Sequence, residues 1–467
     1  MRLKANPQIS LEFGPSHLKV TREYYEKYRR INQILTQTPE ILEVFHGEVC
    51  RALNVSGRKR LSGFTSEELL RAILVMEIEG LPYREAVIRI DDSLFLRRFV
   101  GIPYGSVMDY TTLAKAYKAI GAEVWKRINE DLGRYALEVG YIEGRMLRVD
   151  TTACETNVHY PTDSSLLWDS YRVLSRWIAR VREYDSEVVG GGRLQSRRAK
   201  RLFQLIARRA NYKESHRLKL KGPYGALLSQ VEHVLEWSTE VASRCEGRLA
   251  QGGYDLETTR ILGGLLAKRA PFERRVIKVL DQAKRRVLYG EAVPNSEKIF
   301  SIFEDHTELI KRGKVSKPLE FGHMVLLGQV ENKFISDYEV FGKRPAKEAS
   351  LVDEIVERHE EMFGHCPESF TTDRGFYESR EQLSRLEDEI ESVSIAKTGS
   401  RTEEDIEREH DPVFRALQRF RAGIEGTVSY LKRCFKMCRC LYRSFKTYCS
   451  SIGSHIFAHN LVVLARL

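Results

Sequence analysis

The sequence MLRVDTT at Met146–Thr152 decides the fold: strand-forming residues run into an acid, Asp150, and two small hydroxyl residues follow. A carboxylate at the end of a buried strand costs several kcal/mol in desolvation unless something compensates it. In functional sites a bound cation is a common compensation. We therefore expect the rest of the chain to supply partner carboxylates for Asp150.

Composition sets the broad class of the protein. A chain of 467 residues with 42% hydrophobic content can bury a large core, and we expect two or three domains. The net charge of +10 favours a polyanionic partner, with nucleic acid as the first expectation. No secretory signal or membrane-length apolar window is visible, and the 8 scattered cysteines are typical of reduced thiols. These features predict a cytoplasmic protein with no membrane partner.

Residues 1–140 read as an amino-terminal all-helical domain. Thr65 and Glu68 form a capping box, and apolar residues then recur at helical spacing until Gly80. Short helices joined by Gly and Pro suit a helix-turn-helix-like bundle that binds DNA ends. A helical dimerisation or packing domain fits the same pattern equally well.

A basic segment stands out in the middle of the chain. Residues 193–222 contain eleven Lys or Arg and one acid, so they carry +10, equal to the net charge of the whole chain. Its arginines are interleaved with apolar residues as in an amphipathic helix, namely Arg197, Arg198, Arg201, Arg208 and Arg209. A solvated helix face is the plain alternative, but this concentration of charge favours contacts with DNA phosphates.

The remaining pattern predicts a mixed α/β sheet interrupted by helices. After the strand at Met146–Thr152, residues 155–295 read as a basic helical insertion. Strand and helix signals then alternate, with strands expected at 299–310, 320–335, 369–373 and 392–397, and helices at 348–363, 381–389 and 412–434. A turn is expected at Glu331–Lys333, and residues 398–409 read as a polar, acidic connector. Without the insertion this order is that of an RNase H-like sheet. We therefore expect residues 141–467 to form an RNase H-like catalytic domain.

Three acids are the candidate catalytic residues. Asp150 and Asp373 both follow predicted strands, and sites in open α/β sheets form beyond the carboxyl ends of strands. Glu425 lies on the last long helix, on one stripe with Arg421 and Lys432 and beside the apolar stripe. Three carboxylates are hard oxygen ligands, which suit Mg²⁺ or Mn²⁺ better than zinc. The flanking cations would neutralise phosphate.

The chain resembles the DDE-type insertion-sequence transposases of bacterial mobile elements. The resemblance is carried by Val149–Thr152 at the first acid, by Thr372–Phe376 at the second, and by Arg421-x3-Glu425-x6-Lys432 at the third. The last resembles the family's Tyr-x2-Arg-x3-Glu-x6-Lys signature.

The likeness extends over most of the chain but has two departures. Phe95–Gly101 and Glu320–His323 also resemble segments of this family, whereas residues 155–295 match only in position and helical character. The signature's tyrosine is replaced by Gln418. The 223 residues between the two aspartates, against 52 from Asp373 to Glu425, place the inserted bulk before the second acid.

The resemblance implies metal-dependent cleavage at transposon ends, followed by transfer of the 3′-hydroxyl into target DNA. Two ions would be held, with Asp150 bridging both and Asp373 and Glu425 each holding one. Arg421, Lys432 and Arg374 would contact DNA. Both transposon ends must be joined, so a homodimer in the DNA complex and association with the nucleoid are expected.

Two alternatives share these residues: a DNA-binding protein that has lost catalysis, and a metal-dependent nuclease that cuts without joining. A zinc site is a further alternative, because Cys434-x3-Cys438 and His455-x3-His459 mimic zinc-ligand spacing. Both pairs read as continuous helix, so packing is the preferred interpretation. The tryptophans and the tyrosine at Trp168, Tyr171 and Trp177 are likewise assigned to a core in preference to base stacking.

Overall fold

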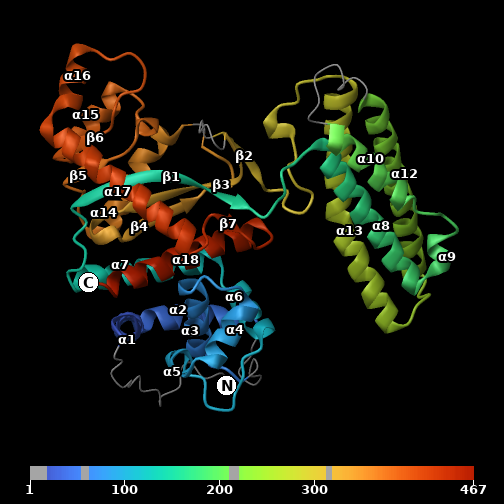
Figure 1. Cartoon of the computed structure of the whole chain (residues 1–467), viewed down its shortest axis with the longest axis horizontal. Helices are drawn as coiled ribbons and strands as arrows, with labels where there is room; N and C mark the ends of the chain where they lie inside the picture. The colour runs from blue at the N-terminus through green and yellow to red at the C-terminus, as the bar shows by residue number, and fades with distance from the viewer. Residues whose placement is uncertain (1–17, 54–62, 210–219, 312–317, 346) are drawn as a thin grey trace. The chain divides into compact units, whose positions relative to one another are not determined.

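The computed structural model describes residues 18–53, 63–209, 220–311, 318–345 and 347–467 (Figure 1). The chain divides into two compact units, one made of Met1–Asn157 with Gly322–Leu467 and the other of Val158–Phe321. The first unit holds most of a mixed sheet and the second is largely helical, so the expected α/β class is confirmed. Within the described ranges, no helix combines the length and the apolar character needed to cross a membrane.

The amino-terminal helices belong to the first unit. They are α1 (Lys19–Gln37), α2 (Pro39–Ala52), α3 (Ser66–Ile78), α4 (Tyr83–Asp92), α5 (Leu94–Val100), α6 (Tyr110–Ala119) and α7 (Ala122–Glu138). The predicted capping box begins α3, because Thr65 accepts from the Glu68 amide and the Glu68 side chain accepts from the Thr65 amide. Helix α3 is buried along almost its whole length.

The sheet is built around the stretch that contains Asp150. Its strands are β1 (Met146–Thr156), β2 (Glu308–Lys311), β3 (Leu319–Gln329), β4 (Ile335–Val340), β5 (Ser369–Thr371), β6 (Ser392–Ser394) and β7 (Arg439–Cys440). The strand order is β2-β3-β1-β5-β6, with β4 also paired to β3 and β7 to β1. β3 runs antiparallel to β1 and β4, whereas β5 and β7 run parallel to β1, and β6 runs parallel to β5.

The later helices of the first unit are α14 (Val352–Phe363), α15 (Arg380–Glu389), α16 (Glu403–His410), α17 (Pro412–Cys434) and α18 (Phe445–Leu464). α17 packs on β1, β5 and β6 and crosses the sheet (Figure 1). Its bounds agree with the predicted helix at 412–434. The sequence predicted that the helix continues past Cys434 to Cys438, and this was wrong: the chain turns, forms β7 and then begins α18.

Two further expectations about local structure were wrong. Residues 299–310 form a strand only from Glu308, and the polar connector after residue 398 contains α16. A capping box at Thr402 and Asp405 begins α16, and Lys397 also donates to Asp405. These hydrogen bonds satisfy the first amides of α16 and hold Asp405, which explains why this polar stretch forms a helix.

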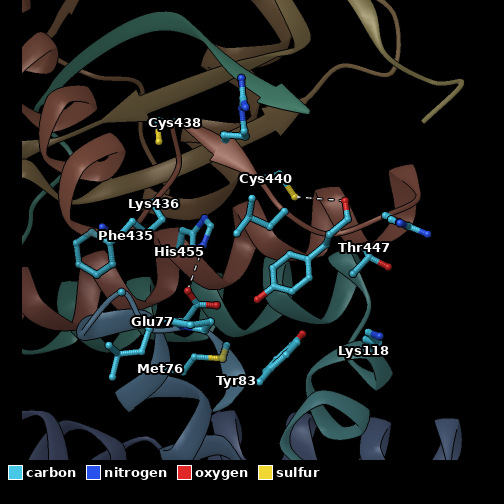
Figure 2. Close-up of a pocket in the computed structure, with 17 residues that line it drawn as sticks. Met76, Glu77, Tyr83, Lys118, Phe435, Lys436, Cys438, Cys440, Thr447 and His455 are labelled. Atoms are coloured by element: carbon cyan, nitrogen blue, oxygen red, sulfur yellow. Dashed lines mark hydrogen bonds and ion pairs between the residues drawn. The ribbon is translucent and has the colours of Figure 1, made fainter. Parts of the chain in front are cut away.

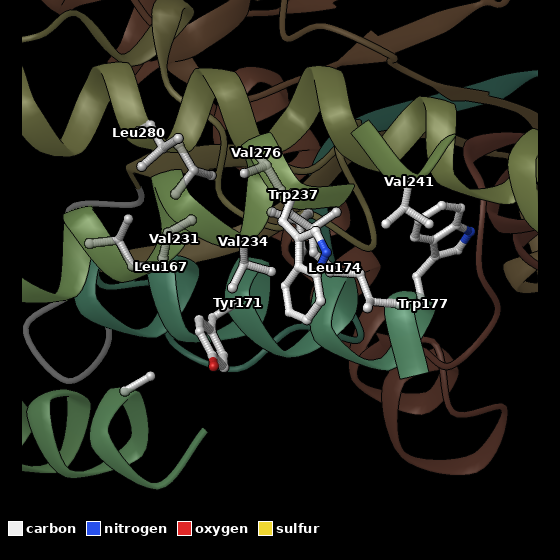
Figure 3. Packing of buried hydrophobic residues seen from close by; sticks show 14 of the residues in the cluster. Leu167, Tyr171, Leu174, Trp177, Val231, Val234, Trp237, Val241, Val276 and Leu280 are labelled. Carbon is white, nitrogen blue, oxygen red and sulfur yellow. The ribbon is translucent and has the colours of Figure 1, made fainter. Parts of the chain in front are cut away.

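The second unit is a helical bundle with its own core. Its helices are α8 (Asp163–Tyr184), α9 (Ser186–Val189), α10 (Ser196–Arg209), α12 (Lys221–Ala250) and α13 (Leu256–Ala283), and a π-helical turn, η2 (Lys284–Leu288), follows. α8 packs against α10, α12 and α13. Tyr171 and Trp177 lie in this core with Trp237 (Figure 3), and the indole of Trp177 donates to the Leu265 carbonyl. Core packing of these aromatic residues is therefore confirmed.

Candidate active site

The parallel pairing of β1 with β5 brings two of the three predicted acids to the same level of the sheet. Arg148 is the partner of Thr371 in this register. Asp150 and Asp373 each lie two residues further along their chains, just beyond the last residues paired between β1 and β5. Asp373 follows its strand as predicted, but the expectation that Asp150 also follows a strand was wrong, because β1 continues to Thr156 and Asp150 pairs with Leu327 of β3. Adjacent strands are about 4.8 Å apart, so the two acids emerge beside each other at the carboxyl end of this strand pair.

The side chain of Asp150 lies on the face of the sheet that α17 covers. Arg148, two residues earlier on the same face, donates from Nη1 to the Phe420 carbonyl of α17 and stacks its guanidinium over the Phe420 ring, 4.3 Å from the centroid. Its Nε donates to Gln329 over 2.7 Å, and Gln329 in turn donates to Thr427 of α17 over 2.8 Å. These contacts fix α17 against β1 and β3.

Arg148 is itself an unusual buried cation, since its side chain is 6% exposed. Burial lowers the pKa of Arg148 to about 10, so the guanidinium remains charged at neutral pH. Gly423 lies against this guanidinium, and a Cβ there would come within 2.4 Å of Arg148 Nη1. Gly423 thus permits the close approach of α17.

Glu425 lies on an exposed flank of α17, and Gln418 anchors that flank to the sheet. The Gln418 amide nitrogen donates to the Ser394 carbonyl over 2.9 Å and to the Thr372 carbonyl over 3.2 Å, at the ends of β6 and β5. Its Oε1 accepts from Arg421 Nε over 3.2 Å. Gln418, Arg421 and Glu425 share one helical stripe, so the stripe faces the strand ends that carry Asp373. The predicted buried stripe of α17 is also present at Leu417, Ile424, Leu431 and Phe435.

A fourth carboxylate, Glu348, was missed by the sequence prediction. It begins the short 3-10 turn η5 (Glu348–Leu351), which leads into α14. Thr151 Oγ1 donates to Glu348 Oε1 over 3.0 Å, and a Cβ on Gly375 would meet Glu348 Oε2 at 2.5 Å and Asp373 Oδ1 at 3.0 Å. Glu348 therefore lies between the residue after Asp150 and the turn after Asp373.

The turn after Asp373 is organised by that acid. Asp373 Oδ1 accepts from the Gly375 amide over 2.8 Å and caps the 3-10 turn η6 (Arg374–Phe376). Asp150 likewise accepts from the Thr151 amide through Oδ1, over 2.7 Å. Each aspartate keeps a second carboxylate oxygen whose position these two bonds do not set. A Cβ at Gly375 would come within 2.5 Å of Glu348 Oε2, so the Glu348 carboxylate would have to shift to accept a larger residue there.

The donor chemistry suits a hard divalent cation, but the side chains of the described residues do not form a metal cluster. Carboxylates at Asp150, Asp373 and Glu425, with Glu348 nearby, are the ligands that Mg²⁺ and Mn²⁺ prefer. Among the residues that the structure describes, no three His, Cys, Asp or Glu side chains are gathered closely enough to hold a metal ion. The register of β1 with β5 brings Asp150 and Asp373 side by side, whereas Glu425 is not placed with them as a third metal ligand in the described structure.

The predicted DNA-binding residues lie in both units. In the first unit, Arg374 is exposed, and Arg421 and Lys432 are half-buried on α17. In the second unit, the predicted basic helix is α10, where Ala199 and Ile206 are buried. Its arginines are all exposed, and none forms an ion pair with the described part of the chain: Arg197, Arg198, Arg201, Arg208 and Arg209. Residues 210–219, which belong to the same basic segment, lie outside the described residues.

The alternative zinc site does not form within the described ranges. His455 pairs with Glu77 over 3.1 Å, and His459 Nε2 donates to the Lys333 carbonyl over 3.1 Å. Cys434 ends α17 and Cys438 precedes β7, both exposed. Both histidines therefore have structural partners.

Comparisons of the chain with protein-family models, with curated proteins and with solved structures found no match. What the site can do therefore follows from its own residues and their arrangement.

Proposed function

We propose that this protein is a DNA transposase of the DDE type, which cleaves DNA at transposon ends and transfers the 3′-hydroxyl into target DNA. One observation carries the proposal. The register of the parallel pair β1 and β5 places Asp150 and Asp373 side by side, beneath the helix that bears Glu425. The catalytic domain is proposed to be RNase H-like. Its support is the chain order β1, helical unit, β3, β4, α14, β5, α15, β6 and α17, which is the order expected for such a domain with an insertion.

The chain's own residues would act as follows. Asp150, Asp373 and Glu425 would hold the divalent ions, Mg²⁺ or Mn²⁺, and bring the scissile phosphate to the place where the pairing of β1 with β5 ends. When bound, two such ions activate water or a 3′-hydroxyl and stabilise the leaving oxygen. Arg421, positioned by Gln418, together with Lys432 and Arg374, would contact phosphates beside the cleaved bond. Glu348 would orient the turn that presents Asp373.

Binding of the DNA is assigned to the cationic surfaces. The arginines of α10 are exposed and free of ion pairs with described residues, which favours sequence-independent contacts with phosphates. The helices of residues 19–138 are proposed to bind transposon ends. A homodimer in the DNA complex is expected, because two ends must be brought together.

The decisive experiment measures cleavage and strand transfer on end-containing DNA with Mg²⁺, comparing the wild type with Asp150→Asn. The variant should keep end binding and lose both chemical steps. Asp388→Asn is a matched control, because Asp388 is an exposed acid on α15 away from the site. Undiminished cleavage by Asp150→Asn would refute the active site. Wild-type cleavage without joining would favour a nuclease, and DNA binding without either step would favour a protein that has lost catalysis.

Metal binding has a test that does not depend on activity. Titration of the full chain with Mn²⁺, followed by the electron paramagnetic resonance signal of the free ion, should show sites that weaken in Asp150→Asn and Asp373→Asn. Asp388→Asn should bind Mn²⁺ as the wild type does. Equal binding by all of these proteins would remove the two aspartates from the metal site.

A further inference from the structure

A large pocket lies within the first unit, apart from the predicted acids. Its volume is about 810 Å³, within the range of small-molecule sites. Figure 2 shows its walls, which come from the end of α3, the turn into α4, α6, the segment around β7, and α18. None of the proposed catalytic or DNA-binding residues lines it. We call it the Tyr83–Tyr442 pocket.

Aromatic rings form one wall of this pocket. Tyr83 and Tyr442 have ring centroids 5.9 Å apart, and the ring of Tyr442 packs on that of buried Tyr117 at 4.9 Å. Burial raises the pKa of both Tyr83 and Tyr442 well above the ordinary tyrosine value, so both phenols stay neutral. Flat neutral rings of this kind favour a planar ring system over a branched aliphatic group.

A buried polar pair lines the same pocket. Glu77 is 5% exposed and His455 is 6% exposed, and His455 Nε2 lies 3.1 Å from Glu77 Oε2. Ser454 donates to the other Glu77 oxygen over 2.9 Å. His455 Nδ1 is buried and has no hydrogen-bond partner among the described residues. That nitrogen has almost no accessible surface, so a ligand in the pocket would meet the accessible edge of the Glu77–His455 pair and not this atom.

Cations surround the pocket and give its mouth a positive charge. Lys118, Lys436 and Arg443 are exposed lining residues that form no ion pair with the parts of the chain that the structure describes. Arg439 also lines the pocket and pairs with Glu155 over 3.3 Å. Lys436 adopts a left-handed backbone conformation, with φ 59°, in the turn after α17. The residues at 438–443, which follow that turn, line the pocket.

We propose that the Tyr83–Tyr442 pocket binds a nucleotide. The base lies against the tyrosine rings, its polar edge meets Glu77 and His455, and its phosphate is neutralised by Lys118, Lys436 and Arg443. An aliphatic anion would use the cations but would make no ring contact with the tyrosines and no polar contact with the Glu77–His455 pair. The nucleotide has two sources with the same chemistry: a free mononucleotide, or a nucleotide turned out of a DNA strand. The inference goes beyond the proposed transposase, and the first source requires neither the acids nor DNA.

The first arm of the test titrates the full-length protein with deoxyadenosine monophosphate by calorimetry. The double variant Lys436→Gln/Arg443→Gln should weaken binding by about tenfold or more, because two charge-assisted contacts are lost. Arg415→Gln/Arg433→Gln is the matched control, since both residues are exposed cations on α17 that do not line the pocket. Asp150→Asn should bind as the wild type does, which separates this inference from failure of the proposed catalysis.

Two further ligands test the chemistry of the pocket. Deoxyadenosine without its phosphate should bind more weakly than the monophosphate, and inorganic phosphate alone should compete poorly. Tyr442→Leu should weaken nucleotide binding while its melting temperature shows that the protein is folded; Tyr442→Phe, which keeps the ring, should bind nearly as well as the wild type. Equal affinity for nucleoside and nucleotide would overturn the role of the cations.

The second arm places 2-aminopurine in a DNA duplex. A base turned out of the stack gains fluorescence, and contact with a tyrosine ring would then quench it in a manner that Tyr442→Leu relieves. A response in the DNA arm alone assigns the pocket to an extruded nucleotide, and binding in the first arm assigns it to a free one. Absence of free-nucleotide binding together with a 2-aminopurine signal unchanged by the pocket variants would overturn the proposal.

Discussion

Thr151 donates a hydrogen bond from Oγ1 to Oε1 of Glu348 over 3.0 Å, which joins β1 to the turn that begins α14. Because side chains alternate along a strand, Thr151 lies on the face of the sheet opposite to that of Asp150. Two successive residues therefore point to opposite faces of the sheet. Asp150 lies beneath α17, whereas Thr151 holds Glu348 beside the turn that follows Asp373.

Glu348→Gln should lower DNA cleavage by about tenfold or more without changing the melting temperature appreciably. Glutamine keeps an oxygen that accepts from Thr151 and removes only the negative charge near Asp373. Thr151→Val, which removes the donor, should instead destabilise the fold by about 1 kcal/mol. Cleavage assays and thermal melting separate the two effects. Full activity of Glu348→Gln would show that Glu348 has only a structural role.

The arginines of α10 predict a strong salt dependence of DNA binding. Arg197→Glu/Arg198→Glu/Arg201→Glu should weaken binding and reduce the slope of log affinity against log salt by roughly 2 to 3, since each phosphate contact contributes about 0.9. The matched control changes exposed cations of α13 to Glu at Arg260, Lys268 and Lys278, which alters the net charge equally. A similar slope in both triple variants would mean that net charge, and not α10, governs binding.

Two buried histidines predict a loss of stability at mildly acidic pH. Burial lowers the pKa of His359 and of His459 to about 4 from an ordinary value near 6.5, and each donates from Nε2 to a carbonyl, of Gly144 and Lys333 respectively. The unfolded chain binds protons between these values and the folded chain does not, so stability falls as the pH decreases through this window. From about pH 7 to about pH 5, each histidine should remove about 2 kcal/mol.

Urea unfolding at the two pH values measures this effect. His459→Gln retains a side-chain donor for the Lys333 carbonyl and should reduce the pH dependence by about half of the combined effect. His410→Gln changes an exposed histidine on α16 and should leave the pH dependence as it is. An unchanged pH profile in His459→Gln would contradict the assignment.

At Gly322 in β3 there is no room for a side chain. A Cβ there would lie 2.0 Å from the Cys154 carbonyl oxygen and 2.7 Å from the Glu155 Cα, so backbone would have to move. Gly322→Ala should destabilise the protein by about 3 kcal/mol. Gly264→Ala in α13, where a Cβ meets nothing within 4 Å, should be neutral or stabilising by up to about 1 kcal/mol. Chemical denaturation measures both; equal stability would refute the steric conflict.

Local signals predicted much of the fold. The capping box at Thr65, the strand from Met146 and the helix from Pro412 to Cys434 are each specified by residues within one or two turns. The turn at Glu331–Lys333 was also predicted, where Asn332 and Lys333 adopt left-handed conformations. Such features depend on neighbours in sequence and can be recognised without the tertiary structure.

The sequence predicted the position of a site residue only where that residue directly follows a strand. Asp373 follows β5 as predicted, whereas Asp150 lies within β1, which continues to Thr156, so its place beside Asp373 depends on the register of β1 with β5. Glu348 could not be predicted, because its place depends on a hydrogen bond to a residue 197 positions away. The pocket at Tyr83 and Tyr442 also arises from segments distant in sequence. The missed break after Cys434 follows from Lys436, whose positive φ no local glycine signals.

The pairing of Glu155 with Gly322 has a consequence for how the chain folds. β1 and β3 are adjacent strands in the middle of the sheet, yet residues 158–321 separate the paired residues in sequence. Pairing of the two strands must therefore close a very long loop. Closure entropy grows with the logarithm of loop length, and distant pairings are slow to form. If the helices of residues 158–321 assemble first from contacts among themselves, the effective loop shortens to the span between their ends. The sheet would then form only after the helical bundle, and substitutions that destabilise the core of the bundle would slow formation of the sheet.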